Sequence, residues 1–131
     1  MPVPGTLKKT VINEQELVKL LQDKFSIDPL VTRTYLRLVQ YGEISLPDIA
    51  KMLDKPMNEV EDLLEKMLSQ GLVIKTAGTV SKYTALHPRM SMTNIFKVYE
   101  KELVQNLRDR RATLDRIVNL LTPIFEDREK E

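Results

Sequence analysis

The sequence predicts a mostly α-helical fold with a small β-hairpin, arranged as a winged helix-turn-helix that is followed by a long C-terminal dimerisation helix. Three observations indicate this fold. Two helical segments, about 46–53 and 57–70, are joined by a three-residue turn. A pair of strands around a Gly-containing turn follows at 72–86. Apolar residues at helical spacing then run from 92 to about 122. A generic helical bundle with a hairpin would not explain this order of elements.

The composition is that of one folded domain without disulfide or metal chemistry. A chain of 131 residues has room for one core, and 42% hydrophobic with 30% charged residues is ordinary for a soluble protein. Cysteine is absent and His87 is the only histidine, which excludes thiolate and multi-histidine ligand sets. No apolar stretch reaches the ~18 residues that span a bilayer, and residues 1–5 lack the apolar block of a secretory signal. We therefore expect a cytoplasmic protein with no membrane partner.

Catalytic groups do not form a recognisable set in this sequence. A serine, histidine and acid constellation, a glycine-rich phosphate loop and a paired-carboxylate pocket are all missing. We therefore expect no enzyme, no catalytic residue, no cofactor and no metal site.

The charge is balanced overall but uneven along the chain. Twenty basic residues stand against nineteen acidic ones, whereas nucleic-acid binders usually carry a clear basic excess. Residues 46–70 hold three basic and six acidic groups, while residues 71–90 hold three basic groups and no acidic one. Any basic footprint must therefore be local.

The chain divides into three predicted parts. Residues 1–12 contain two prolines and a glycine without a hydrophobic period, which is typical of a flexible arm. We expect a winged helix-turn-helix domain over 13–90, and a long C-terminal helix with a charged tail over 91–131.

The first two helices of the winged domain have clear starting signals. Asn13, followed three residues later by Glu16, resembles a capping box and predicts a helix over about 14–25. Asp28 and Pro29 fit the cap and first turn of a second helix, which Gly42 ends.

The helix-turn-helix and the wing come next. A third, short helix starts at Ser45 and breaks at 54–56, and its inward residues are expected to be Ile49, Ala50, Met52 and Leu53. Gly71 ends the fourth helix, whose apolar face consists of Val60, Leu63, Leu64, Met67 and Leu68. Strands at 72–74 and 80–86 then form the wing.

The C-terminal helix is predicted from Met92 to about Thr122, where Pro123 ends it. At 1.5 Å per residue it is roughly 45 Å long, more than the winged domain needs for its own core. We therefore expect a homodimer, formed as a coiled coil through Ile95, Tyr99, Leu103, Leu107, Arg110, Leu114, Ile117 and Leu121. Arg110 interrupts the stripe. It sets register through a paired charge, marks a helix splayed to solvent, or binds an anion.

Residues 25–90 resemble the TrmB-like winged-helix regulators, mostly archaeal transcription factors, with the MarR and ArsR groups as more distant relatives. The resemblance rests on Thr34-Tyr35-Leu36, Tyr41-Gly42-Glu43, Ile49-Ala50, Val60 with Leu63 and Leu64, Gly71-Leu72-Val73, and Lys82-Tyr83 before Pro88. Most of these are core or turn positions, so they argue for the fold more strongly than for function. The resemblance implies transcriptional regulation through duplex DNA.

In that family the fourth helix enters the major groove. Here Asn58 and Glu59 are the candidate base readers, since Asn pairs with adenine and Glu accepts from cytosine. Phosphate contacts are expected from wing Lys75 and Lys82, from Lys51 and Lys55 around the turn, and from Arg33, with Arg37, on the second helix. Solvation alone is the alternative role for each of these basic residues.

The fourth helix also supports a rival interpretation. Glu59, Glu61 and Asp62 lie where phosphates would repel them, although acids near a helix start also complement its dipole without binding anything. The alternative function is a protein-interaction module of a transcription or assembly complex, in which this acidic helix faces a basic partner.

Overall fold

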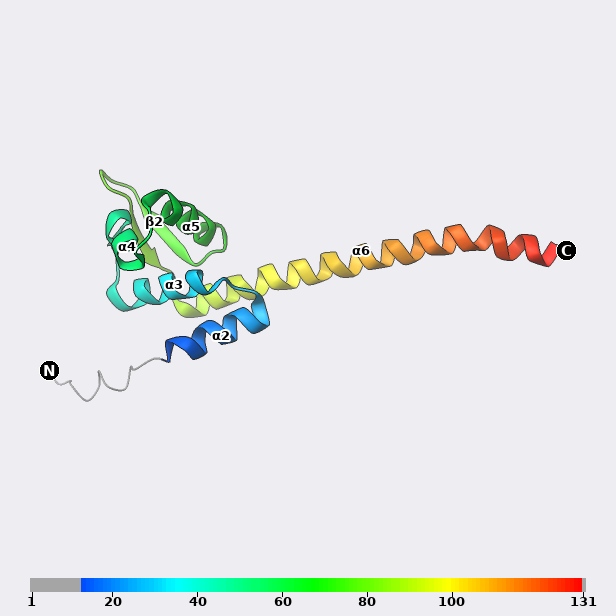
Figure 1. The fold of residues 1–131 in the computed structure, drawn as a ribbon, viewed down its shortest axis with the longest axis horizontal. Helices are drawn as coiled ribbons and strands as arrows, with labels where there is room; N and C mark the ends of the chain where they lie inside the picture. Colours follow the sequence, from blue (N-terminus) through cyan, green and yellow to red (C-terminus); the bar gives the residue numbers. More distant parts are fainter. Residues whose placement is uncertain (1–12, 131) are drawn as a thin grey trace. The chain divides into compact units, whose positions relative to one another are not determined.

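The computed structural model describes residues 13–130. Its elements, in chain order, are α2 (Glu14–Phe25), α3 (Pro29–Tyr41), β1 (Ile44–Ser45), α4 (Leu46–Leu53), α5 (Met57–Ser69), β2 (Val73–Thr76), β3 (Lys82–Ala85) and α6 (Pro88–Lys130) (Figure 1). The mostly helical fold predicted from the sequence, with its winged helix-turn-helix and long C-terminal helix, is confirmed. The expected arm at 1–12 lies outside the described residues.

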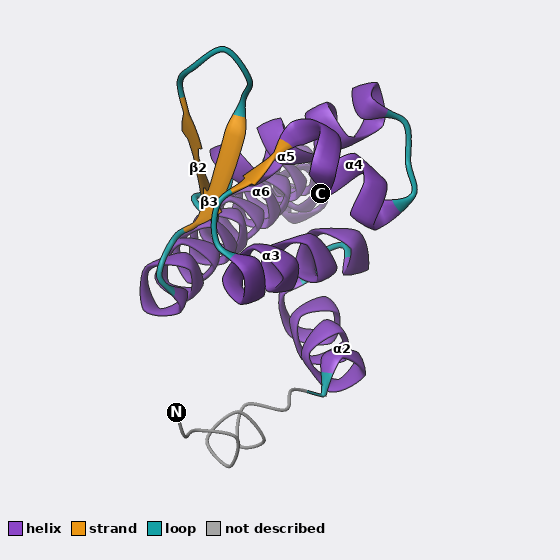
Figure 2. Ribbon diagram, turned by 90° about the vertical axis from the view of Figure 1, so that its left-hand side faces the viewer, coloured by secondary structure: helices purple, strands orange, loops and turns teal. Residues whose placement is uncertain are grey.

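The hairpin belongs to a three-stranded antiparallel sheet with strand order β1-β3-β2 (Figure 2). Ile44 pairs with Tyr83, and Val73 pairs with Ala85. The sequence predicted only the two-stranded hairpin. Strand β1 was missed because it is two residues long and its second residue, Ser45, also caps α4, where its hydroxyl accepts a hydrogen bond from the Asp48 amide at 3.4 Å.

The predicted helix starts are confirmed by side-chain caps. The Asn13 side chain accepts a hydrogen bond from the Glu16 amide at 2.9 Å, and Asp28 accepts one from the Leu30 amide at 2.8 Å. Helix α3 ends at Gly42 and α5 is followed by Gly71, both with positive φ. At Gly71 a side chain would also collide with Asn94, so this position requires glycine.

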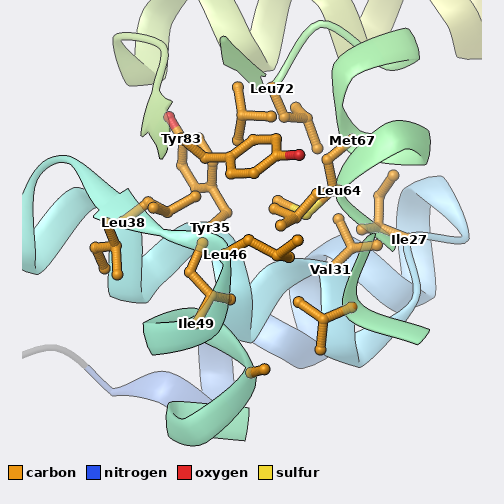
Figure 3. Packing of buried hydrophobic residues seen from close by; sticks show 14 of the residues in the cluster. Ile27, Val31, Tyr35, Leu38, Leu46, Ile49, Leu64, Met67, Leu72 and Tyr83 are labelled. Atoms are coloured by element: carbon orange, nitrogen blue, oxygen red, sulfur yellow. The ribbon is translucent and has the colours of Figure 1, made fainter. Parts of the chain in front are cut away.

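The core lies between α3, α4, α5 and the sheet (Figure 3). Tyr83, Leu64 and Met67 are completely buried in it. Ile49 and Ala50 of α4 point inward as expected, and Leu53 packs against the core. The expectation for Met52 was wrong, because its side chain is 42% exposed. Helix α4 is only two turns long and its opposite side faces solvent.

Helix α6 differs from its prediction at both ends. It begins at Pro88 rather than Met92, because His87 caps it: the Arg89 amide donates to Nδ1 of His87 at 3.0 Å. Proline is well tolerated in the first turn, where its missing N–H has no partner in any case. The helix also continues through Pro123 to Lys130. Pro123 removes one hydrogen bond there without ending the helix.

The described chain forms two units, which meet between Phe96 and Lys97. Residues 13–96, called the winged unit below, contain the core, and the first turns of α6 belong to it: Ser91 and Ile95 are buried, and the Asn94 side chain donates to the Gly71 carbonyl at 2.8 Å. Residues 97–130, called the helical segment below, are exposed throughout. Across 13–130, no helix is long and apolar enough to cross a membrane.

Candidate nucleic-acid interface

Helix α5 buries one face and exposes the other. Val60, Leu64 and Met67 anchor it in the core, which leaves Asn58 and Glu59 exposed on its first turn. The residue before the helix is Pro56, and no side chain caps the helix N-terminus. Its first backbone N–H groups therefore remain available, with the positive end of the helix dipole behind them.

Lys51 and Lys55 border this uncapped end. Together with the helix start they line an open hollow made by Pro47, Ala50, Lys51, Asp54, Lys55, Pro56 and Met57. Both lysines are exposed, and within residues 13–130 neither forms an ion pair. Two exposed cations beside a helix N-terminus suit a phosphate oxygen.

The wing does not bring its two lysines together. Lys75 pairs with Tyr83 across the sheet, whereas Lys82 pairs with Thr76. Paired residues share a face and neighbours alternate, so the two lysines leave opposite faces. Tyr83 is buried, which places Lys75 on the core-facing side and Lys82 on the solvent side.

Lys75 forms an ion pair with a glutamate of α5. Its Nζ lies 4.0 Å from Oε2 of Glu65 and 6.0 Å from the centre of the Tyr83 ring. The pair is largely exposed, and such pairs contribute at most about 1 kcal/mol. A phosphate would have to replace the glutamate before Lys75 contacted DNA.

Arg33 lies elsewhere. Its Nε is 3.5 Å from Glu14 of α2, and Nη2 of Arg37 lies 3.1 Å from the same carboxylate. Both arginines therefore join α3 to α2, which lies across α3 from the wing in Figures 1 and 2. The sequence analysis named Arg33 as a candidate phosphate contact. It did not predict the ion pair with Glu14, because the two residues are far apart in the chain.

Two side chains near the wing escaped the sequence analysis. Thr76 donates to Oε2 of Glu43 at 2.8 Å, which ties strand β2 to the turn before β1. This contact depends on β1, so no sequence signal could have located it. Thr76 also shares the solvent face with Lys82.

Two tyrosines next to the wing, Tyr35 and Tyr83, are buried in the core. Burial raises the pKa of Tyr83, and the nearby Lys75 ammonium opposes this rise to a lesser extent. Burial also raises the pKa of Tyr35, whose hydroxyl donates to the Leu86 carbonyl at 2.7 Å. Both remain neutral at physiological pH and act as core residues.

The predicted dimerisation stripe separates into two groups. Ile95 is only 5% exposed and packs in the core of its own winged unit, so it is not available to a partner. The others lie on the helical segment, and the large apolar ones are exposed: Tyr99, Leu103, Leu107, Leu114, Ile117 and Leu121. Within residues 13–130 no carboxylate pairs with Arg110, whereas its neighbour Arg111 pairs with Asp115 at 3.5 Å.

The family model of the sugar-specific transcriptional regulator TrmB matches residues 21–89, which is more than half of the chain. The chain belongs to the TrmB family. This is a family of transcriptional regulators, not a class of enzymes.

Two curated TrmB relatives come from archaea. The DNA-binding HTH-type transcriptional repressor TrmBL2 of Thermococcus kodakarensis is 23% identical over 113 residues, covering 86% of this chain and 43% of that protein. The putative HTH-type transcriptional regulator TrmBL2 of Pyrococcus furiosus is 21% identical, covering 88% and 44%. The chain thus spans less than half the length of these relatives.

Solved structures show the same fold. A structure of TrmBL2, described as an archaeal chromatin protein with a novel mode of DNA binding, matches with a TM-score of 0.73 at 20% identity, over 86% of this chain and 43% of that one. The ST1889 protein of Sulfolobus tokodaii matches with a TM-score of 0.57 at 14% identity, over 72% and 99%. MarR of E. coli matches with a TM-score of 0.50 at 13% identity, over 92% and 96%.

Proposed function

We propose that this TrmB-family chain is a transcriptional regulator that binds duplex DNA as a homodimer. The winged domain contacts DNA, the helical segment pairs the chains, and no catalysis takes place. The observation that carries the proposal is the exposed outer face of α5, with an uncapped N-terminus beside Lys51 and Lys55, in a family of transcriptional regulators.

Phosphate contacts supply most of the affinity in this proposal. Lys51 and Lys55 approach one phosphate beside the start of α5, and Lys82 reaches another from the solvent face of the wing. Each contact releases counterions, so the slope of log K against log salt steepens by about 0.9 for every phosphate neutralised. A homodimer doubles the number of contacts, which makes a large net charge unnecessary.

Base contacts are few. Asn58 and Glu59 occupy the exposed first turn of α5, and they read adenine and cytosine respectively. Further along the helix Glu61, Asp62 and Glu65 are exposed and repel phosphates. We therefore expect that the N-terminus of α5 approaches DNA and that the rest of the helix is held away from it.

A salt titration of duplex DNA binding, followed by fluorescence anisotropy, tests the proposal. The double variant Lys55→Ala with Lys82→Ala should bind all sequences more weakly and flatten the salt dependence. The matched control is Lys19→Ala with Lys24→Ala on α2, which removes the same charge and should change the affinity much less. Failure of the unmodified protein to bind duplex DNA in ~50 mM salt would overturn the proposal.

One observation favours a second function. Glu59, Glu61, Asp62 and Glu65 give α5 an acidic exposed face, with Lys75 as its partner cation. A basic protein surface would fit this face. Changing Glu59, Glu61 and Asp62 to their amides distinguishes the two functions: DNA binding predicts tighter non-specific binding, because repulsion is lost, or weaker binding to one preferred sequence. Unchanged DNA affinity would favour the protein partner.

A further inference from the structure

Three residues connect α5 to the wing, and Gly71 is the middle one. Helix α5 ends at Ser69 and β2 begins at Val73, so residues 70–72 form the linker between the two elements. Gly71 has a φ of 75°, a conformation that costs a glycine little and other residues more. This linker therefore sets how the wing is held relative to α5, and both elements approach DNA in the proposed function.

Asn94 of α6 holds the linker in place. Its side-chain nitrogen donates to the Gly71 carbonyl at 2.8 Å, and its Cγ and Nδ2 occupy the space that a Cβ at position 71 would need. Glycine adopts positive and negative φ about equally readily, so the linker has no strong preference of its own. The Asn94 contact thus selects one of the conformations that are open to Gly71.

The end of the hairpin next to this linker is also held by α6. Leu72 and Leu86 lie just outside the paired strands, and the Leu86 amide donates to the Leu72 carbonyl at 2.9 Å. The buried Ser91 hydroxyl lies 3.4 Å from the Leu72 carbonyl oxygen and 3.3 Å from that of Leu86, so its one proton can be donated to either. Tyr35 of α3 donates to the same Leu86 carbonyl at 2.7 Å. The start of α6 therefore contacts both strand ends of the wing.

Gln70 indicates that the held conformation has a cost. Its Oε1 is buried and accepts no hydrogen bond from any residue within 13–130. A buried acceptor without a partner is unfavourable, because it has lost its hydrogen bonds to water. Rotating the linker so that Gln70 reaches solvent would recover this loss. The conformation of the linker therefore depends on the Asn94 contact rather than on the linker itself.

We propose that Asn94 is a positioning residue for DNA binding. It fixes the angle between α5 and the wing, so that Lys82 reaches a phosphate when the N-terminus of α5 approaches DNA. Asn94 acts through Gly71 and does not contact DNA itself. The inference rests on the proposed function for the role of Lys82, and it does not depend on how two chains pair.

The orientation of the wing can be measured without DNA. Because the chain has no native cysteine, nitroxide labels can be attached at Thr79→Cys on the wing and at Lys66→Cys on α5. Pulsed electron paramagnetic resonance, in a large excess of unlabelled protein, then measures the distance between the labels within one chain. Asn94→Ala should broaden or shift this distance distribution, because the linker regains other conformations. An unchanged distribution would overturn the proposal.

Two controls separate positioning from a general loss of structure. A second label pair, Lys24→Cys on α2 with Lys66→Cys on α5, does not include the wing, and Asn94→Ala should leave its distance unchanged. Asn119→Ala, on the exposed part of α6, should change neither distance. If Asn94→Ala also alters the distance between α2 and α5, the core itself has changed and Asn94 is not a positioning residue.

The salt dependence of DNA binding tests whether Asn94 acts through Lys82. Asn94→Ala should flatten the slope of log K against log salt by up to about 0.9 for each phosphate contact of the wing that is lost. This flattening should be absent when Lys82→Ala is already present. It should be undiminished in a Lys55→Ala background, because Lys55 does not belong to the wing. Equal flattening in both backgrounds would overturn the route through Lys82.

The label distances and the DNA titration can fail separately. If Lys82→Ala alone leaves DNA binding unchanged, the phosphate contact assigned to Lys82 in the proposed function is wrong, and so is the route from Asn94 to DNA. The label distances still decide whether Asn94 orients the wing. If the unmodified protein binds DNA and Asn94→Ala binds equally well at every salt concentration, Asn94 has no positioning role in DNA binding.

Discussion

The winged unit and the helical segment differ in how far their leucines are buried. Leu64 of α5 has no exposed surface, whereas Leu114 of α6 is 58% exposed. The winged unit packs sixteen buried residues into one core cluster, and residues 97–130 contribute none to it. The stability of the winged unit is therefore a property of one chain. In the proposed homodimer the helical segment obtains its stability from association, because most helical stability comes from packing rather than propensity.

The same contrast applies to charge. In the winged unit several ion pairs link different elements, such as Glu14 of α2 with Arg33 and Arg37 of α3. Within residues 97–130, Arg111 pairs locally with Asp115, one helical turn later. A pair within one helix adds only about 0.3–0.5 kcal/mol. Ion pairs thus join different elements of the winged unit, whereas in the proposed homodimer the apolar stripe of the helical segment contacts the second chain.

The largest effect is expected from Leu64→Ala in the winged unit. It removes a fully buried side chain between α5 and the sheet, which should lower the free energy of unfolding by about 3–5 kcal/mol. Because the core belongs to one chain, the loss should not depend on protein concentration. Urea denaturation followed by tyrosine fluorescence measures it. A loss that shrinks as the concentration rises would contradict the division between the two regions.

Gly71→Ala should have the next largest effect, about 2–3 kcal/mol of destabilisation. Gly71 has a φ of 75°, and an added Cβ would collide with the Asn94 side chain that binds its carbonyl. Gly42→Ala is the control without a collision: its φ of 81° and ψ of −140° favour glycine but the space around it is open, so only backbone strain of about 1–3 kcal/mol is expected. Thermal unfolding of both variants would show whether the Asn94 contact matters, and equal losses would show that it does not.

Alkaline pH should produce a smaller effect through Tyr83. Burial raises the pKa of Tyr83 in the folded state above its usual value of 10.0, so the fold favours the protonated phenol. Stability is therefore complete below pH 10 and falls as pH rises through the raised pKa. Tyr83→Phe should reduce this fall, although buried Tyr35, whose pKa is also raised, will retain part of it. Exposed Tyr41→Phe serves as the control, and an identical alkaline loss in both variants would refute the prediction.

The sequence predicted those features of the winged unit that depend on local signals. Asn13, Asp28 and Gly42 mark helix ends because their side chains or conformations act on neighbouring residues. The apolar faces of α3 and α5 follow from helical spacing for the same reason. The features that were missed depend on contacts between distant segments: strand β1 exists only through its pairing with β3, and Arg33 binds a carboxylate nineteen residues earlier.

The ends of α6 illustrate a different limit of prediction from sequence. The sequence predicted a helix that begins at Met92 and ends at Pro123, yet α6 begins at Pro88 and continues through Pro123. A proline can lie in the first turn of a helix or directly after a strand, so its presence does not locate the helix start. The cap from His87 places the start of α6 at Pro88. Ile95 was assigned to the wrong surface for a similar reason. The apolar stripe of α6 is continuous in sequence, but its first turns pack on the core of the winged unit and the rest of the stripe is exposed.

The smallest effect on the winged unit is expected from Leu114→Ala, and it tests the comparison most directly. Leu64→Ala and Leu114→Ala remove the same atoms, from a closed core in one case and from an exposed face in the other. In dilute solution Leu114→Ala should leave the unfolding of the winged unit unchanged within about 0.5 kcal/mol. At high concentration it should weaken self-association, because the removed side chain belongs to the apolar stripe of the proposed homodimer. Circular dichroism across a hundredfold range of concentration, with sedimentation on the same samples, separates the two effects. If Leu114→Ala shifts the unfolding midpoint of the winged unit in dilute solution, the two regions unfold as one cooperative structure and the contrast between them does not hold.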